Sequence, residues 1–348
     1  MRGKHTWQEI TSQSQIWEKT LHHFEKQRQT VENFPNQTPF ERLLVIGCGS
    51  THYLAQSAAT TLTRYAGIPA LACPSSELWL YADHMPVEET GLLAISRSGT
   101  TTETLRAVNR FQKTAGGPVI AITCSLSSTL AQQADLVISA PHAQEVSVAQ
   151  TRSFTSMLLL SQALTAVLGE DHHMLQHLHH LPEALARMLD RAGDLPRQLG
   201  EDLQIERLFF LGGGPLYGLA NEAMLKTKEM SLSFAEAYHP MEFRHGPMSM
   251  VNEQTLVVGF VSDTGETNEI RLLHDMAQLG ARTLALIQDA SAFVSWHPDH
   301  VIELQSGLNE WQRGALYLPV VQCLAYHRAI AKGLDPDKPH NLSAVIEL

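Results

Sequence analysis

The chain of 348 residues carries the same pair of short motifs twice. An arginine, four apolar residues and two glycines separated by one residue begin at Arg42 and again at Arg207. A hydroxyl-rich stretch containing one glycine follows in each half, at Ser96–Glu103 and at Ser262–Glu269. The two motifs recur at offsets of 165 and 166 residues, so their separation is kept to within one residue. A fixed internal period of this kind indicates a duplicated domain.

Each copy begins with a short apolar run that ends at a glycine turn before a helical pattern. Such near-continuous apolar runs are typical of parallel strands buried on both faces, and their alternation with helices predicts an α/β fold with a parallel sheet. Besides the runs that follow Arg42 and Arg207 and the run that begins at Thr255, the strands are expected at Ile68–Ala72, Gly91–Ile95, Pro118–Thr123, Asp135–Ser139, Thr283–Ile287 and Val301–Leu304.

The repeat and the helical patterns between its copies define the expected domain boundaries. We expect an N-terminal helical segment over 1–33, a first α/β domain over 34–173, a helical linker over 174–198, a second α/β domain over 199–338 and a C-terminal tail over 339–348.

Charge and hydropathy narrow the possible partners. The formal net charge is −11, which disfavours a nucleic-acid partner because phosphate backbones require a basic face. No run reaches the roughly 18 apolar residues of a membrane span, and the polar N-terminus lacks the apolar stretch of a signal peptide. We therefore expect a cytoplasmic protein with no membrane partner.

A metal site is not expected. The four cysteines have no paired metal spacing and are predicted to be reduced, mostly in the core. In the histidine-rich stretch, His173, His177 and His180 share one helical face, but no suitably spaced cysteine or carboxylate completes a ligand set. A solvated helix face is the preferred interpretation.

The stretch from Leu92 to Thr104 has the pattern of a phosphate site. An apolar run breaks into hydroxyls around Gly99 and leads into a helical pattern, so hydroxyl and backbone N–H donors gather at a helix N-terminus. An ordinary N-cap is the alternative. In the second copy Asp263 stands where the first has Arg97, and its negative charge would repel phosphate. Phosphate is therefore assigned to Ser96–Thr101, and the second loop is expected to be structural.

The segment between the two motifs of the second half holds the candidates for proton transfer. Lys226 and Glu229 are three residues apart, on the same helix face. An exposed, weak ion pair is the alternative. Because this helix follows a glycine turn after a strand, we expect the pair at the carboxyl end of a parallel sheet, where ligands bind. His245 lies in a proline-bounded turn and is either structural or a proton carrier.

Five motifs carry a resemblance to a known family: Gly47–Thr51, Ser96–Glu103, Glu145–Phe154, Lys226–Glu229 and Glu236–Pro247. In this order they resemble the sugar isomerase (SIS) domains of glucosamine-6-phosphate synthase, over about residues 34–348. The resemblance implies two tandem SIS domains, each a flavodoxin-like three-layer α/β/α sandwich with a five-stranded parallel sheet. It also implies a homodimer with shared sites, and no cofactor.

The same resemblance assigns roles to individual residues. Glu229 corresponds to the base that transfers a proton, Lys226 to its neighbouring lysine, and His245 to a ring-opening histidine donated by the partner subunit. The residues implied to bind the phosphosugar are Gly49, Ser50, Thr51, Ser96, Arg97, Ser98, Thr101, Glu145 and Gln150.

Three departures from the family pattern bear on the reaction. No glutaminase domain precedes the SIS domains, so release of ammonia from glutamine is not expected. The tail places Ala344 where the synthase has a lysine that forms a Schiff base. Arg97 replaces the glutamine usual between the two serines, and a guanidinium there binds phosphate or a carboxylate.

These observations predict a phosphosugar isomerase that acts on an amino-sugar 6-phosphate, with deamination as in a glucosamine-6-phosphate deaminase. Two alternatives stay open. One is a deglycase of an amino-acid-linked ketosamine 6-phosphate, for which Arg97 would contact the carboxylate. The other is a regulator that binds a sugar phosphate without turnover, although Glu229 and His245 together favour an enzyme.

Overall fold

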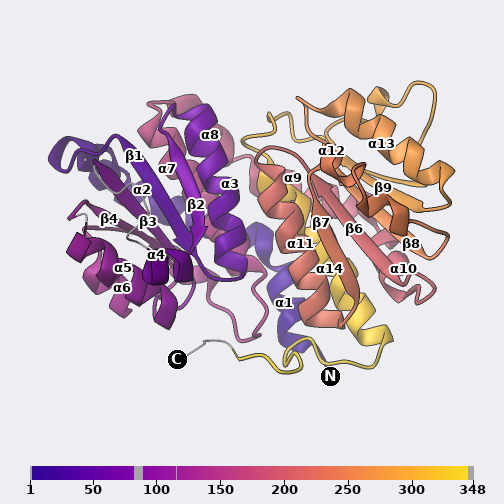
Figure 1. Cartoon of the computed structure of the whole chain (residues 1–348), viewed down its shortest axis with the longest axis horizontal. Coiled ribbons are helices and arrows are strands. Elements are labelled where there is room, and N and C mark those ends of the chain that lie inside the picture. Colours follow the sequence, from indigo (N-terminus) through magenta and orange to yellow (C-terminus); the bar gives the residue numbers. More distant parts are fainter. Residues whose placement is uncertain (1, 82–88, 115, 344–348) are drawn as a thin grey trace. The chain divides into compact units, whose positions relative to one another are not determined.

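The computed structural model describes residues 2–81, 89–114 and 116–343. The chain divides into two compact units, which are described separately. The first unit comprises Gln15–Glu145 and Gln150–His179. The second comprises the N-terminal residues through Ser14, the short segment Val146–Ala149, and His180–Leu342. Each unit contains one sheet with its own helices (Figure 1).

The first unit is built on a five-stranded parallel sheet in the order β2-β1-β3-β4-β5. Its strands are β1 (Arg42–Gly47), β2 (Ala70–Pro74), β3 (Thr90–Ser96), β4 (Val119–Thr123) and β5 (Leu136–Ser139). Its helices are α2 (Gln13–Gln37), α3 (Ser50–Tyr65), α4 (Ser75–Tyr81), α5 (Thr102–Thr114), α6 (Thr129–Gln133), α7 (Arg152–Leu168) and α8 (His172–Leu178).

Both faces of this sheet are buried because the strand residues alternate between two apolar layers. Leu44, Leu92 and Val119 pack in one cluster with residues of α4, α5 and α6. The intervening residues, such as Val45 and Leu93, are also fully buried and face the side where α3 and α7 lie. The result is the covered parallel sheet predicted from the apolar runs, in the three-layer α/β/α arrangement that the family resemblance implies.

The second unit repeats this plan with the order β10-β9-β8-β6-β7, again all parallel. Its strands are β6 (Arg207–Gly212), β7 (Phe234–Tyr238), β8 (Thr255–Phe260), β9 (Arg282–Ile287) and β10 (His300–Glu303). Its helices are α1 (Lys4–Thr11), α9 (Leu181–Ala192), α10 (Leu195–Glu201), α11 (Leu216–Ser231), α12 (Pro240–Phe243), α13 (Glu266–Gln278) and α14 (Tyr317–Ala331).

Helices also cover both faces of the second sheet (Figure 1). Phe209 and Val257 pack in a cluster with Leu272 and Met276 of α13. On the opposite face Phe260 lies against Tyr317, the first residue of α14, with ring centroids 5.3 Å apart. The duplicated α/β domain predicted from the repeat, and the two sandwiches with five-stranded parallel sheets implied by the resemblance, are thus confirmed.

One strand, β7, has no counterpart among the apolar runs. Its sequence Phe-Ala-Glu-Ala-Tyr is short and mixed because β7 is the edge strand of the sheet, and only Ala235 is buried. Edge strands need no continuous apolar run. The stretch His172–Glu201 forms α8, α9 and α10. Among the described residues, no helix combines the length and the apolar character needed to cross a membrane.

Candidate active site

The first unit brings two loops to one edge of its sheet. β1 ends at Gly47, β3 ends at Ser96, and the two strands are hydrogen-bonded neighbours. From β1 the chain goes to β2 on one side and then to β3 on the other, so the topological switch point lies between β1 and β3. Ligands of open α/β sheets bind outside the carboxyl ends of the strands at such a point. The loops after β1 and β3 are therefore well placed for a ligand.

The loop after β3 has the features of an anion site. Gly99 has a φ of 66°, and a Cβ there would lie 2.1 Å from a serine hydroxyl, so a larger residue does not fit. The Gly99 amide donates to Ser96 Oγ at 3.1 Å, and Ser96 Oγ lies 3.2 Å from Thr101 Oγ1. The Thr100 amide donates to Ser98 Oγ at 3.2 Å. α5 follows directly, so its N-terminal amides and positive dipole end add to these hydroxyls.

The loop after β1 is equally tight. A Cβ on Gly47 would lie 2.4 Å from the backbone of Thr51, so only glycine permits the close approach of strand and helix. The hydroxyl of Thr51 accepts from the Cys48 amide at 2.9 Å. Gly49, with φ 55°, precedes the start of α3, and Ser50 and Thr51 are buried in its first turn. The residues predicted at this loop thus line the switch point.

Arg97 of the phosphate loop pairs with Glu145. The Arg97 side chain is 9 % exposed, and its Nη1 lies 3.5 Å from Oε2 of the fully buried Glu145 carboxylate. Glu145 also accepts from the Thr151 amide at 2.7 Å, from the Thr151 hydroxyl at 2.6 Å and from the Ser153 hydroxyl. Glu145 therefore ties the phosphate loop to the segment that leads into α7. In this segment the half-buried Gln150 keeps a buried Oε1 that has no hydrogen-bond partner among the described residues.

In the second unit, α11 carries a buried charge cluster. The Lys226 side chain is 1 % exposed and lies between two carboxylates: its Nζ is 3.4 Å from Glu222 Oε1 and also contacts Glu229. Glu222 is fully buried, whereas Glu229 is 19 % exposed. An exposed surface pair is thus excluded. Glu222 was missed from the sequence, although charges at 222, 226 and 229 follow one face of a largely buried helix.

The structure corrects the expected place of Glu229. α11 begins after β6 and runs back along the sheet, and Glu229 lies in its last turn, about 20 Å from the helix start. It therefore does not lie at the carboxyl edge of the second sheet. Next to it, Met230 packs with Ala149, Ala325 and Ala329 in a buried cluster. Met230 thus links the last turn of α11 to the segment Val146–Ala149, which lies in the chain between Glu145 and Gln150.

His245 lies in the turn after α12 with an exposed side chain. Two residues that precede it in the same segment, Glu236 and His239, make other contacts. The Tyr238 hydroxyl donates to Glu236 Oε2 at 2.7 Å, and the His239 ring stacks on Tyr217 with centroids 3.7 Å apart. Burial lowers the pKa of His239, which keeps this imidazole neutral at pH 7.

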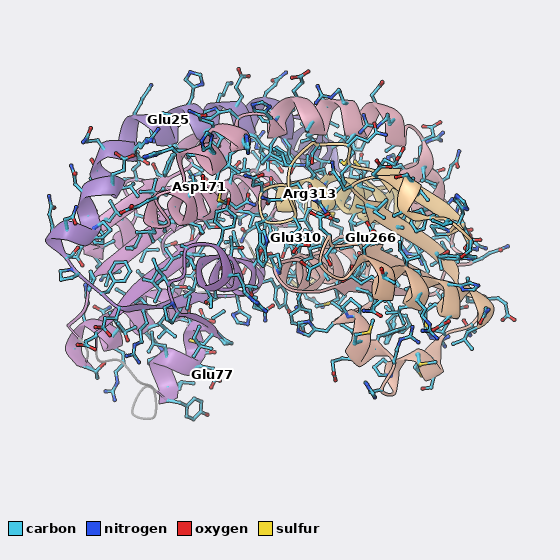
Figure 2. All side chains as sticks on the ribbon, turned by 90° about the horizontal axis from the view of Figure 1, so that it is seen from above. Glu25, Glu77, Asp171, Glu266, Glu310 and Arg313 are labelled. Atoms are coloured by element: carbon cyan, nitrogen blue, oxygen red, sulfur yellow. The ribbon has the colours of Figure 1, made fainter. Side chains whose placement is uncertain are left out.

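The second hydroxyl loop is closed by carboxylates of its own unit. The Ser262 amide donates to Glu269 at 2.7 Å, and the Thr264 amide and hydroxyl donate to Glu310 at 3.0 and 2.6 Å. Asp263 accepts from the Glu310 amide at 3.2 Å and is also bound by Arg313; both partners are labelled in Figure 2. The donors that would face a phosphate are thus occupied by side chains of the protein.

No group of three or more His, Cys, Asp or Glu side chains in the described part of the chain is arranged to hold a metal ion. In the histidine-rich stretch, His172 Nδ1 lies 2.8 Å from Arg28 Nη2, and His179 Nε2 lies 3.2 Å from Glu25 Oε1. The Schiff-base position of the tail, Ala344, falls outside the described residues.

Solved structures of other proteins share this fold over nearly the whole chain. A glucosamine-6-phosphate deaminase from Thermotoga maritima is 29% identical, with a TM-score of 0.80, over 99% of this chain and 100% of that one. A tagatose-6-phosphate ketose/aldose isomerase from Escherichia coli has a TM-score of 0.88 at 24% identity, over 98% of this chain and 96% of that one, which supports the fold alone.

Sequence comparison adds relatives that are longer than this chain. The glutamine–fructose-6-phosphate aminotransferase of Sulfurisphaera tokodaii is 31% identical over 314 residues, and that of Pyrobaculum aerophilum 30% over 315. These alignments cover 88% and 87% of this chain, which spans about half the length of the two relatives. The SIS domain family matches residues 39–167 and 203–332. The chain therefore belongs to the SIS family, with two tandem SIS domains homologous to the isomerase half of these aminotransferases.

Proposed function

We propose that the protein is a phosphosugar isomerase that converts an amino-sugar 6-phosphate to a ketose 6-phosphate with release of ammonia. The phosphate binds to the loop Ser96–Thr101, and the sugar extends along the segment that begins at Glu145. Glu229 is the base, Lys226 orients its carboxylate, and His245 opens the sugar ring.

The observation that carries this proposal is a series of contacts from the anion loop to the proposed base. Arg97 pairs with Glu145, the chain continues through Val146–Ala149, and Ala149 packs with Met230, the residue after Glu229. Each contact lies within one unit or along the backbone. The anion loop and the last turn of α11 are thus each tied to one continuous stretch of chain, Glu145–Ala149.

After ring opening, the proposed reaction consists of an isomerisation, in which C1 is reduced and C2 is oxidised, followed by hydrolysis. His245 carries the proton from the anomeric hydroxyl to the ring oxygen, which opens the sugar. Glu229 removes the proton from C2 and returns it to C1, so C1 is reduced and C2 is oxidised to an imine. Lys226 stabilises the negative charge that develops on the intermediate. Water then adds to C2 and ammonia leaves, which gives the ketose phosphate.

Full-length similarity favours deamination over the synthase reaction. The Thermotoga maritima protein, named a glucosamine-6-phosphate deaminase, matches this chain over essentially the whole length of both. The aminotransferases match over only half of their length. We also propose a homodimer with shared sites, for which the exposed turn at His245 offers a side chain to a second copy.

The test is to incubate the purified protein with glucosamine 6-phosphate and to measure ammonia and fructose 6-phosphate. We expect turnover in the wild type and a loss of at least 100-fold in kcat for Glu229→Gln, because the amide cannot accept a proton. Glu266→Gln, which changes a half-buried glutamate on α13, is the matched control and keeps kcat within twofold. Binding of the sugar phosphate without turnover would instead make the protein a regulator.

The deglycase alternative rests on Arg97. If the leaving group were an amino acid, its carboxylate would need a cation, and the candidate is the buried Arg97 guanidinium, which already pairs with the carboxylate of Glu145. A ketosamine 6-phosphate assayed in parallel decides between the two reactions. Turnover of that compound with release of the amino acid would replace the deaminase assignment.

A further inference from the structure

We propose that Glu9, on the N-terminal helix α1, is a positioning residue that holds the segment Val146–Ala149 in the conformation that binds substrate. This inference rests on the proposed function, because the segment lies between Glu145 and Gln150. The contacts of Glu9 stand independently of any substrate.

Glu9 is a buried carboxylate that accepts several hydrogen bonds from one short segment. Glu9 is only 3 % exposed. Oε1 accepts from the Val146 amide at 2.5 Å and from the Ser147 amide at 3.3 Å, and Oε2 accepts from the Ser147 hydroxyl. Hydrogen bonds to a charged acceptor are about twice as strong as neutral ones. Glu9 therefore fixes two successive peptide groups.

The chain just after the segment is held in the same manner by a different carboxylate, that of Glu145. Glu145 accepts from the amide and the hydroxyl of Thr151 and from the hydroxyl of Ser153. Two buried carboxylates thus bind the backbone on either side of Val148–Gln150. The stretch between them supplies Ala149 to the cluster with Met230 and contains Gln150, whose Oε1 is buried and unpaired among the described residues.

The attachment of α1 itself does not depend on Glu9. Asp337 accepts hydrogen bonds from the Thr6 amide at 2.7 Å and from the Thr6 hydroxyl at 2.8 Å, which caps the helix. On its apolar face Ile10 packs with Cys323 and Tyr326. An apolar residue at position 9 would also suit helix packing, so the buried carboxylate is explained by the amides that it binds.

The start of the segment has little packing to hold it. Val146 is 71% exposed, whereas Ser147 is 1 % exposed. The hydrogen bond from the Val146 amide to Glu9 is therefore an important restraint on Val146. The segment continues directly into Gln150, the proposed substrate contact. A displacement of the segment therefore also displaces Gln150.

The experiment compares Glu9→Gln, Glu9→Asp and the control Asp337→Asn in the full chain. Amide hydrogen exchange without ligand measures the clamp, and calorimetric titration with glucosamine 6-phosphate measures its effect on the site. For Glu9→Gln we expect at least tenfold faster exchange at Val146 and Ser147 and a Kd that is about tenfold higher, since an amide in place of the carboxylate is a weaker acceptor. In the kinetic assay KM rises and kcat falls less than threefold.

The two control variants separate positioning from stability. Asp337→Asn lowers the melting temperature but leaves the Kd within twofold, and Glu9→Asp, which keeps the charge, recovers part of the affinity. Unchanged exchange in Glu9→Gln, or faster exchange with an unchanged Kd, overturns the inference. An equal loss of affinity in Asp337→Asn overturns it as well. Absence of binding by the wild type refutes the proposed function, while the exchange rates still decide whether Glu9 holds the segment.

Discussion

The guanidinium of Arg313 makes two hydrogen bonds to the carboxylate of Asp263, at 2.8 and 2.6 Å. The pair occupies the loop of the second SIS domain that corresponds to the phosphate loop of the first. There the corresponding position is Arg97, and the charge is reversed. The duplicated loops have therefore diverged electrostatically: at the same position one carries a cation paired with Glu145 and the other an anion paired with Arg313.

The first prediction compares the two loops through matched substitutions. Thr101→Ala should raise the Kd for glucosamine 6-phosphate about tenfold, since a hydroxyl next to a phosphate group contributes about 1 to 1.5 kcal/mol. Thr267→Ala removes the corresponding hydroxyl of the second copy, on an exposed position of α13, and should leave the Kd unchanged. Titration calorimetry measures both. Equal losses of affinity would show that the second loop also binds the sugar.

The second prediction concerns the buried lysine. Lys226→Met leaves the carboxylates of Glu222 and Glu229 next to each other without their cation, which should cost about 3 kcal/mol of stability. The double variant Lys226→Met/Glu222→Gln should recover part of that loss and stay inactive. Lys228→Met changes an exposed lysine of the same helix and is the control. Thermal melting and the ammonia assay report the two effects, and an active double variant would remove Lys226 from the mechanism.

The third prediction is a pH dependence of stability from Glu269. Burial, the largest cause, raises the pKa of Glu269 to about 7, although hydrogen bonds from Ser262 oppose the shift. The folded state then binds a proton that the unfolded state has released, so this group's contribution to stability is full below about pH 4.5 and declines as the pH rises to about 7.

Glu269→Gln should abolish this decline. Its melting temperature relative to the wild type should increase by a few degrees between pH 5 and pH 8, as the charged carboxylate is no longer buried. Glu253→Gln removes the same charge from an exposed residue that does not act on Glu269, and is the control. If the melting temperatures of the wild type and of Glu269→Gln instead change equally with pH over this range, the raised pKa assigned to Glu269 is contradicted.

The fourth prediction addresses the choice between the two candidate reactions. Arg97→Gln removes the cation beside Glu145 while the hydroxyls of the phosphate loop remain. For a deaminase, we expect KM for glucosamine 6-phosphate to rise less than fivefold. For a deglycase, we expect kcat/KM for the ketosamine phosphate to fall at least 100-fold, because a bidentate contact to a carboxylate is lost. Steady-state kinetics on both substrates distinguishes these outcomes.

The strands and the hydroxyl-rich loop after β3 could be predicted because their signals are local. Gly91–Ile95 forms most of β3, and the hydroxyls that follow stand at the start of α5. The edge strand β7 was not predicted from the sequence, because an edge strand has a neighbour on one side only and needs no continuous apolar run. The position of Glu229 was wrong because a helix 16 residues long carries its last turn far from the sheet edge where the helix starts.

The sequence by itself determined the duplication, the parallel sheets and the hydroxyl loop, since these follow from residue spacing and from which side chains avoid water. Only the tertiary structure decided what surrounds each charge. Lys226 became a buried partner of Glu222, Glu310 closed the second loop, and Glu9 reached amides 137 residues away along the chain. Such contacts depend on side chains from distant segments. No periodicity encodes them, because the energy of a buried carboxylate is set by the donors that folding brings to it.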